Sequence, residues 1–427
     1  MTSIYQVRTL TISSGERLPL LVNALDGQPL YWPTIYSLTE LRARNRASNT
    51  ISHSLRSILF FHLFLDLRQI DLYARIQAGQ LLALSEIEDL VRLSRLPVER
   101  VTAMTPLNSG EIQKFRVVSL AEKRRVRLPT DHSIEIDPTS VGNRLRYIRD
   151  FIGWLATERL LRLGTNAESK TQLEVSIKRV ISAIDARLPA PKTAGSFGQR
   201  EGLEPEVATR LFQVIDPESQ DNPWKNRHAR ERNALAIQWM YHLGLRRGEL
   251  LGVRISDIDF QKGTVLIARR ADDPHDPRRY QPNAKTKARE IPLLDSLQRI
   301  TSDYIMDARA SIPGARKHDF LLVSGDTGAP WSVVSLAKAF QVLREKCKDL
   351  PRDLSAHVLR HTWNENFSIA MDKEKTGEET EKKIRSYLMG WSETSGTAAT
   401  YTRRHIRNKA REVSLDIQKK MQAGKKP

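Results

Sequence analysis

The chain has 427 residues, more than one ordinary hydrophobic core accommodates, and this length predicts two or three domains. Its 68 lysine and arginine residues exceed its 50 aspartate and glutamate residues, which gives a formal net charge of +18. Such an excess is typical of proteins that face a polyanion or an anionic membrane. Ordinary glycine and proline contents exclude collagen-like, low-complexity and wholly disordered chains.

The positive charge is unevenly distributed along the chain. Residues 1–200 include 28 basic and 19 acidic residues. Residues 402–427 include 9 basic and 2 acidic residues. The single cysteine, Cys347, excludes an intramolecular disulfide, and the most apolar run, residues 58–67, is far too short to span a membrane. Because no signal-peptide pattern opens the sequence, we expect a cytoplasmic protein.

The first half of the chain predicts an arm followed by helices. Residues 1–35 indicate an N-terminal arm of short strands and turns, and residues 36–187 a helical domain. Ser85 and Glu88 match a capping box that would open one helix. A second helix is predicted after Pro138, because apolar residues recur at helical spacing and leave Arg144 and Arg149 elsewhere on the helix. These apolar residues are Val141, Leu145, Ile148, Ile152 and Leu155.

The second half predicts a mixed domain. Residues 188–202 are rich in proline, glycine, alanine and serine and indicate a linker. Residues 203–405 then predict helices interrupted by a β segment, with one strand ending near residue 267 and another at residues 289–293. Residues 406–427 form a basic tail. The predicted fold is therefore mainly α-helical with a small antiparallel β-sheet.

The first segment suited to phosphate chemistry is residues 244–252. Arg246 precedes a helix-breaking glycine, and Glu249 follows three residues later. This spacing can place a guanidinium in a cleft and brace it from the next helical turn. An ordinary solvated turn has the same composition, so the segment alone leaves both interpretations open.

The second segment is residues 355–362. His357, Arg360 and His361 stand at i, i+3 and i+4, so a helix projects all three from one face. Two histidines at this spacing can bind a metal, but the metalloprotease motif requires glutamate where Val358 stands. An arginine with two imidazoles suits a phosphate better, because it binds oxygens bidentately while they transfer protons. A helix without a special role is the remaining alternative.

The third and fourth segments place a lysine in a turn and a tyrosine among cations. Residues 284–292 enter a strand with Lys285 and Lys287, either of which could donate a proton from a hairpin tip, or simply be solvated. Leu388-Met389-Gly390-Trp391 precedes Tyr401, and the cations after Tyr401 can stabilise a nucleophilic phenolate. By itself, such a tyrosine is more often structural.

In this order the segments resemble the catalytic series of the tyrosine recombinase (phage integrase) family. The sequence motifs that carry the resemblance are GLRRGELLGV, KTKAREIPL, HVLRHT and YLMGW with ATYTRR. The resemblance implies a helical core-binding (SAM-like) N-terminal domain and an α+β catalytic domain. It departs from the family in the charged stretch 371–383 and in a gap from Trp391 to Tyr401 that is about one residue longer than usual. Trp391 also replaces the commoner histidine.

The resemblance implies a site-specific recombinase that cuts and rejoins DNA through a 3′-phosphotyrosine, in integration or excision. Tyr401 would be the nucleophile and Lys285, or Lys287 two residues on, the general acid. Arg246 and Arg360 would clamp the phosphate. His357 and Trp391 would add donors, with Glu249 and His361 as supports. Basic residues of the helical domain are the candidates for DNA binding: Lys123, Arg124, Arg125, Arg127, Arg144 and Arg149.

The implied partners are double-stranded DNA and further copies of the chain, forming a tetramer on DNA, possibly linked by the C-terminal tail. No cofactor and no metal is expected, and the location would be cytoplasmic, at the nucleoid of a prokaryote. Three alternatives remain. They are a type IB topoisomerase-like enzyme that acts alone, a DNA-binding regulator without activity, and a metal hydrolase that uses His357 and His361.

Overall fold

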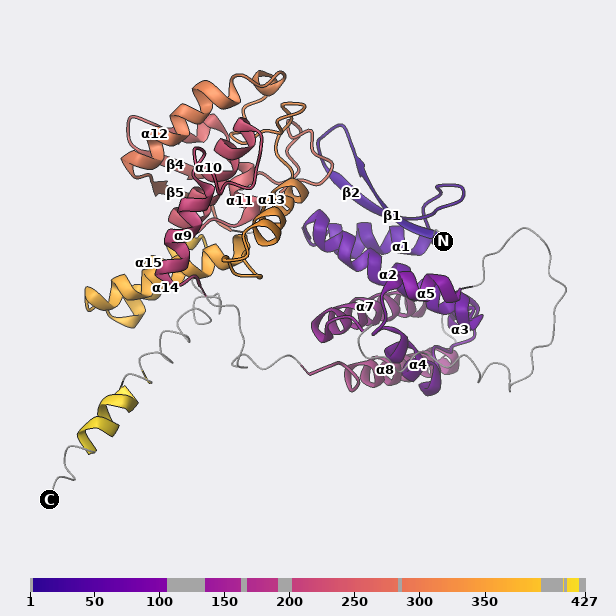
Figure 1. The fold of residues 1–427 in the computed structure, drawn as a ribbon. Coiled ribbons are helices and arrows are strands. Elements are labelled where there is room, and N and C mark those ends of the chain that lie inside the picture. The colour runs from indigo at the N-terminus through magenta and orange to yellow at the C-terminus, as the bar shows by residue number, and fades with distance from the viewer. Residues whose placement is uncertain are drawn as a thin grey trace. The chain divides into compact units, whose positions relative to one another are not determined.

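The computed structural model describes residues 3–105, 135–162, 167–190, 202–282, 286–392, 410 and 413–421. The chain divides into two compact units, Met1–Ser196 and Phe197–Pro427, and Figure 1 shows the elements of each. The division falls within residues 188–202, for which the composition predicts a linker, while the predicted domain boundaries themselves stay predictions. Among the described residues, no helix combines the length and the apolar character needed to traverse a bilayer.

Unit 1 begins with a β-hairpin that belongs to its hydrophobic core. Strands β1 (Tyr5–Thr11) and β2 (Arg17–Asn23) pair antiparallel, with Tyr5 opposite Asn23. Leu21 of β2 is completely buried, and both strands contact helix α2 (Ser48–Arg68). The first residues of the chain therefore contribute a packed hairpin, whose burial stabilises it although its polar and apolar residues alternate poorly.

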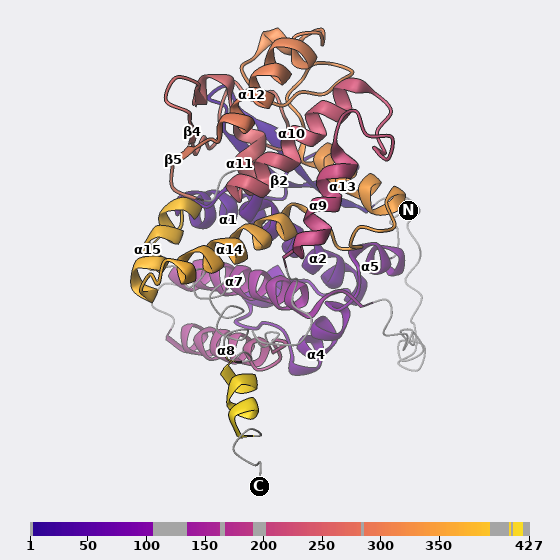
Figure 2. The same ribbon diagram turned by 60° about the vertical axis from the view of Figure 1, so that its left-hand side comes forward.

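The rest of unit 1 is helical. Almost all of α2 between Ile51 and Leu65 is buried, because the hairpin, α4, α5 and α7 surround it. Helices α7 and α8 lie side by side in Figures 1 and 2 and are in contact. The other elements are α1 (Tyr31–Tyr36), the π-helical η1 (Ser37–Arg42), α3 (Leu72–Gln77), α4 (Leu84–Leu93), α5 (Val98–Met104), α7 (Pro138–Arg162) and α8 (Ala167–Asp185).

One helix prediction in unit 1 is confirmed and one detail is wrong. In α7 all five apolar residues at helical spacing are buried. Helix α4 exists, but it is not capped by Ser85 and Glu88. The N-cap is Ala83, whose N–H donates to the Glu86 carboxylate at 2.8 Å. Glu86 also forms a bidentate pair with Arg75 at 2.7 and 2.9 Å, which holds the carboxylate at the helix start.

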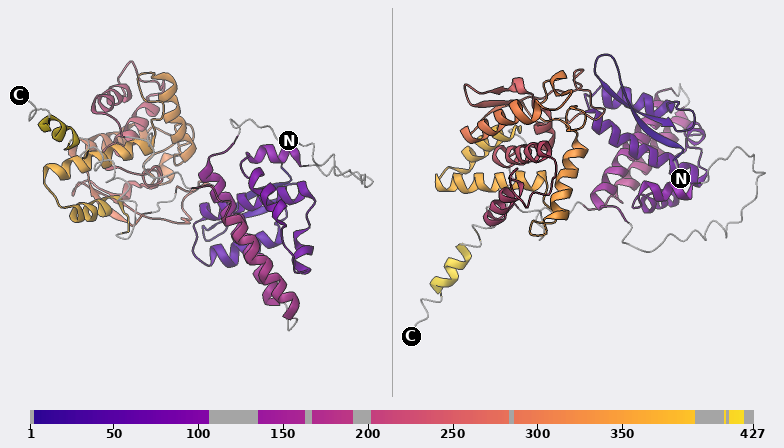
Figure 3. Two further views of the ribbon diagram at one scale, coloured as in Figure 1. Left: turned by 90° about the horizontal axis from the view of Figure 1, so that it is seen from below. Right: turned by 45° about the horizontal axis from the view of Figure 1, so that its top comes forward.

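Unit 2 is built around helix α10 (Arg227–Leu243). Its Trp239 is completely buried and donates its indole N–H to the Thr301 hydroxyl at 3.0 Å. Figure 3 shows the two units from two further directions, each with its own cluster of helices. The other α-helices named in unit 2 are α9 (Pro205–Ile215), α11 (Arg247–Gly252), α12 (Asp295–Asp303), α13 (Val333–Lys346), α14 (Ala356–Lys373) and α15 (Glu378–Met389). The unit also contains the π-helical η4 (Tyr304–Arg309) and the short 3-10 helices η3 (Ile255–Asp257) and η5 (Ala315–Lys317).

A small antiparallel sheet completes unit 2, with the strand order β3–β4–β5. Its strands are β3 (Ile258–Asp259), β4 (Thr264–Ile267) and β5 (Arg289–Pro292). The alternation of β5 turns Arg289 and Ile291 to the buried face, opposite Ile267 and Val265 of β4. The mainly helical fold with small antiparallel sheets is therefore as the sequence predicts.

Candidate active site

The junction between α10 and α11 positions the first arginine. Gly244 ends α10 in the left-handed conformation, at φ +61°, where a β-carbon would lie 2.8 Å from ring carbons of Trp363. Arg246 then precedes α11 as its N-cap residue. The tight turn therefore requires glycine and fixes where the Arg246 side chain leaves the backbone.

Glu249 is the buried centre of the site. Its side chain has no exposed surface, and one carboxylate oxygen accepts the Arg246 backbone N–H at 2.9 Å. The Arg246 guanidinium lies 3.4 Å from the other oxygen, and that of Arg289 donates to both oxygens, at 3.1 and 3.4 Å. The Thr286 hydroxyl donates to it at 2.6 Å. Arg360 lies 3.7 Å away.

The charge of Glu249 is maintained by these partners. Burial alone would raise the pKa of its carboxyl group, but the guanidinium groups of Arg289 and Arg360 and the hydrogen bonds from Arg289 and Thr286 lower the pKa below its usual value. An ionised carboxylate is therefore buried behind the arginines. It holds them in place without occupying the space in front of them.

Helix α14 supplies the second group of residues. The Arg360 guanidinium, almost completely buried, donates to the Gly244 carbonyl at 2.5 Å. The ring nitrogens of His357 and His361 lie 3.0 Å apart, so one imidazole donates to the other. The predicted common face of these three residues is therefore present. Within the described part of the chain, no group of three or more histidine, cysteine or acidic residues is placed to hold a metal ion.

The end of α15 brings Trp391 to the same place. Gly390 ends the helix in the left-handed conformation, and Trp391, which is largely buried, donates its backbone N–H to the Ser386 carbonyl at 2.8 Å. The Trp391 ring lies 5.5 Å from the Arg360 guanidinium carbon, at a distance suited to a cation–π contact. Arg246, Glu249, His357, Arg360, His361 and Trp391 are thus gathered from three separate segments.

Two of the predicted reactive residues, Tyr401 and Lys285, lie outside the described residues. Lys287, the alternative lysine, is described: its side chain is exposed and its backbone N–H donates to the Gly390 carbonyl at 2.9 Å. The segment that leads into β5 is therefore joined to the end of α15 at Lys287.

A pocket of about 450 Å³ opens in front of these arginines. None of the described residues that line it is acidic, so the pocket suits an anion. Sequence reasoning missed Arg247 and Arg344 among them. Arg247 adjoins Arg246 in the sequence, whereas nothing in the sequence around Arg344 indicates a site. The lining residues are Arg246, Arg247, Leu336, Ala337, Phe340, Arg344, Ser355, Ala356, His357 and Arg360.

The predicted DNA-binding residues of unit 1 have different surroundings. Lys123, Arg124, Arg125 and Arg127 lie outside the described residues. Arg144 is partly buried over the ring of Phe60 and donates to the carbonyls of Ser94 and Leu96 at 2.8 Å, which closes the end of α4. Burial lowers the pKa of Arg144 to about 10. These contacts give Arg144 a structural role, and its binding to DNA stays a prediction.

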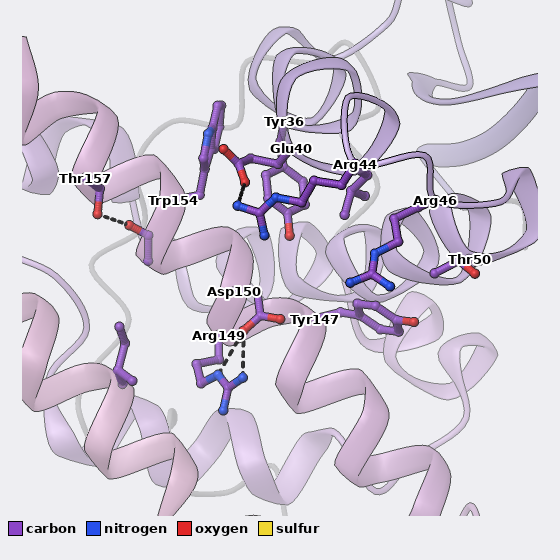
Figure 4. A pocket seen from close by; sticks show the side chains of 13 residues that line it. Tyr36, Glu40, Arg44, Arg46, Thr50, Tyr147, Arg149, Asp150, Trp154 and Thr157 are labelled. Carbon is purple, nitrogen blue, oxygen red and sulfur yellow. Dashed lines mark hydrogen bonds and ion pairs between the residues drawn. The ribbon is translucent and has the colours of Figure 1, made fainter. Parts of the chain in front are cut away.

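Arg149 lines a second pocket, of about 550 Å³, inside unit 1. Figure 4 shows Arg149 beside Asp150, and Arg44 paired with Glu40 across the same pocket. Arg149 also pairs with Asp185. Arg46, which sequence reasoning missed, is exposed and forms no ion pair with the described residues. Each acid here stands at the pocket surface, so the charge of this pocket is largely balanced.

Comparisons with known proteins identify relatives of the chain that contains this site. Residues 202–406 match the model of the phage integrase family. The chain is 24% identical over 284 residues to the tyrosine recombinase XerC of Proteus mirabilis, which covers 66% of this chain and 77% of that protein. The arginines that line the pocket suit an anion such as a phosphate, and residues 202–406 are a phage integrase domain. Through this domain the chain is similar to the tyrosine recombinases, a family that cuts and rejoins DNA at specific sites.

Solved structures of similar proteins were also found. The Tn1549 transposon integrase in complex with circular intermediate DNA matches with a TM-score of 0.47 and 13% identity, covering 87% of this chain and 95% of that one. The XerH site-specific recombinase bound to palindromic difH substrate matches with a TM-score of 0.43 and 14% identity, covering 91% and 94%.

Proposed function

We propose that this recombinase binds the scissile phosphate in the 450 Å³ pocket of unit 2 and cleaves DNA with Tyr401. The observation that carries the proposal is the placement of Arg246 and Arg360, which Glu249 holds from behind while the pocket in front of them has no acidic lining residue among those described. Fixed donors of this kind stabilise the charge that develops on the non-bridging oxygens in the transition state.

In the proposed reaction Tyr401 gives its phenolic proton to His357, and its oxygen attacks phosphorus and forms a 3′-phosphotyrosyl bond. The bond from phosphorus to the 5′ oxygen breaks, its electron pair stays on that oxygen, and Lys285 supplies the proton. His357 and the indole N–H of Trp391 add hydrogen bonds, and His361 orients His357 through the 3.0 Å contact between their rings. Because the phosphotyrosyl bond keeps the energy of the phosphodiester, a 5′-hydroxyl of another strand can reverse the step.

The test is covalent trapping on a nicked suicide substrate, which loses a short strand on cleavage and so prevents rejoining. We expect the wild-type chain to form a complex that survives denaturant, with DNA joined through its 3′ phosphate, and Tyr401→Phe to form none. Full trapping by Tyr401→Phe would show that another residue is the nucleophile. Absence of trapping by the wild-type chain on its own target site would favour the regulator alternative.

The same substrate on two duplexes separates a recombinase from a topoisomerase-like enzyme. A recombinase transfers the cleaved strand to the second duplex, whereas an enzyme that acts alone only rejoins the original strand. We expect exchange between duplexes, since the family is defined by recombination. Rejoining without exchange would contradict the proposal while leaving the chemistry intact.

We further propose that copies of the chain assemble on double-stranded DNA through the C-terminal tail. Residues 413–421 are helical, and Val413, Ile417 and Met421 stand at i, i+4 and i+8 with 53%, 51% and 69% of their surfaces exposed. An apolar stripe on an exposed helix is suited to docking. We expect serine at these three positions to reduce assembly on a two-site DNA to smaller complexes, measured by mass photometry, with single-site cleavage unchanged. Unaltered assembly would show that the tail is only a basic DNA contact.

A further inference from the structure

A buried network of hydrogen bonds connects the proposed phosphate clamp, Arg246 and Arg360, to the segment that leads into β5. The Arg289 side chain is only 1% exposed and donates to both oxygens of Glu249, the residue that also holds Arg246 and Arg360. Thr286 donates to the same carboxylate at 2.6 Å and accepts from Arg289 at 3.3 Å. Thr286 immediately follows Lys285 in the sequence. The carboxylate is therefore shared between the clamp and the segment that carries the proposed general acid.

Arg289 also connects this network to the end of α15. Its Nε donates to the Leu388 carbonyl at 2.6 Å, within the last turn of the helix. At Gly390 a β-carbon would lie 2.7 Å from Nη1 of Arg289, 2.8 Å from Cβ of Thr286 and 2.9 Å from the Lys287 carbonyl oxygen. The glycine therefore allows the turn before Trp391 to pack directly on the hairpin, and Arg289 fills the space between them.

The geometry suits a guanidinium and not an ammonium. A planar guanidinium presents donors in fixed directions, so one group can bind a carboxylate with two nitrogens and a carbonyl with the third. A lysine ammonium also has three donors, but they sit on a single nitrogen, so it cannot span the two carboxylate oxygens and the Leu388 carbonyl as the separated nitrogens of a guanidinium do. Since β5 turns Arg289 to its buried face, the side chain is not among the described residues that line the pocket.

We propose that Arg289 is a positioning residue for the proton-transfer half of the reaction. By joining Glu249, Thr286 and Leu388, it fixes Thr286, the residue that follows Lys285 in the sequence, relative to the carboxylate that holds Arg246 and Arg360. This inference rests on the proposed function, because it requires Lys285 to protonate the leaving oxygen. Loss of Arg289 would displace the proton donor while the arginine clamp, still paired with Glu249, remains.

The test uses two suicide substrates that differ in one atom. One has the ordinary 5′ oxygen at the scissile phosphate, and the other has a bridging sulfur there. When the phosphorus–sulfur bond breaks, the electron pair leaves on a thiolate, which needs no proton because thiols are far stronger acids than alcohols. Cleavage of the sulfur substrate therefore depends on the phosphate clamp and the nucleophile but not on the general acid.

We expect Arg289→Met to slow single-turnover cleavage of the oxygen substrate about 100-fold, the lower end of what a positioned proton donor contributes. On the sulfur substrate the rate should stay within about threefold of wild type. Arg289→Lys keeps a buried positive charge beside Glu249 and should show the same selective loss, since it lacks the fork. DNA affinity should be unchanged in both variants.

Arg309→Met is the matched control. Arg309 is a buried guanidinium of unit 2 that donates to the carbonyls of Phe320, Ala315 and His318, and none of these belongs to the site. We expect its loss to slow both substrates equally or neither. The amplitude of the fast phase on the sulfur substrate counts correctly folded enzyme, so rates are compared per active molecule even where a variant is less stable.

Two outcomes would overturn the inference: an equal slowing of Arg289→Met on both substrates, or no slowing on either. A purely structural role predicts the equal slowing. Failure of the proposed function is a separate result, because the wild-type chain would then form no covalent complex with either substrate. A wild-type chain that cleaves both, beside a variant without selective loss, contradicts only the role of Arg289.

Discussion

Two pockets in the described part of the chain, one in each unit, both gather arginines, but they place the opposing carboxylates differently. In unit 2 the carboxylate of Glu249 is buried behind Arg246 and Arg360. In unit 1 the acids stand at the pocket surface, where Glu40 pairs with Arg44, and Asp150 with Arg149. A buried carboxylate orients guanidinium groups and leaves their outer edges available, whereas surface pairs cancel the charge that a ligand would meet. The first arrangement suits catalysis, and the second suits a weaker, adaptable contact.

The largest expected effect breaks the clamp of unit 2. Arg360→Ala should lower the single-turnover cleavage rate at saturating DNA by about 10²–10³-fold, since it removes a fixed donor to the transition-state oxygens. Arg149→Ala, the matched change in the pocket of unit 1, should leave the cleavage rate unchanged at saturation. Covalent trapping on a suicide substrate measures both. A similar loss in the two variants would show that the pockets do not differ in the way described.

The second effect concerns stability. Glu249→Gln should destabilise unit 2 by about 3–5 kcal/mol, because it leaves buried guanidinium groups without a counter-charge. Glu40→Gln removes a pair in which Arg44 keeps 66% of its side-chain surface exposed, so we expect about 0.5 kcal/mol or less. Urea unfolding, followed by hydrogen exchange in each unit, gives both values. Equal free energies of unfolding for the two variants would remove the distinction between buried and surface carboxylates.

The third effect is the pH dependence of stability, which should differ between buried His62 of unit 1 and buried Glu249 of unit 2. In α2 burial lowers the pKa of His62 to about 4, while an unfolded histidine titrates near 6.5. The unfolded state therefore binds the proton first, and unit 1 should lose up to about 3 kcal/mol as the pH falls from 6.5 to 4. The contribution of Glu249, whose pKa is lowered, persists as the pH falls to the usual glutamate pKa of about 4.3 and is lost below it.

His62→Leu tests this assignment. In the variant, the hydrogen-exchange stability of α2 should become nearly independent of pH between 6.5 and 4.5, while unit 2 keeps its own dependence. His228 of unit 2, whose pKa burial lowers to about 4, serves as the internal reference. If α2 keeps the full pH slope without His62, another group in unit 1 is responsible.

The smallest expected effect is on DNA affinity. Arg46 lines the pocket of unit 1 without an ion pair among the described residues, so it can bind a DNA phosphate without first breaking a pair. Arg46→Ala should reduce the slope of log affinity against log salt by about 1. Arg149→Ala should reduce the slope by less, since its guanidinium is paired with Asp150 and Asp185. If the slope of log affinity against log salt were the same for the two variants, the ion pairs of Arg149 would not limit its contact with DNA.

Local sequence patterns predicted much of this molecule because the information they need is local. The apolar spacing after Pro138 specifies α7, and the spacing of His357, Arg360 and His361 specifies one helix face. The predicted capping box of α4 was wrong because Arg75, which lies outside the motif, pairs with Glu86 and holds that carboxylate at the start of the helix. Arg144 looks like a surface cation in the sequence, yet it closes α4 from 48 and 50 residues away.

Residues whose role depends on distant partners were not predictable in this way. Arg289 appears in the sequence only as the first residue of a strand, and its function depends on Glu249, 40 residues earlier, and Leu388, 99 residues later. Arg344 enters the pocket because α13 packs on α11, which no local pattern indicates. Short catalytic motifs in a sequence thus identify the side chains proposed to act on the substrate. They identify less readily the side chains that hold those reactive groups in position.

The buried carboxylate of Glu249 also has a consequence for synthesis of the chain. During translation α11 emerges long before its partners, since Arg289 follows Glu249 by 40 residues and Arg360 follows Gly244 by 116. A nascent chain that stops short of α14 keeps this carboxylate in water and cannot assemble a phosphate clamp. We therefore expect truncated chains that end before α14 to lack this arrangement of Arg246, Glu249 and Arg360, and with it the proposed phosphate site.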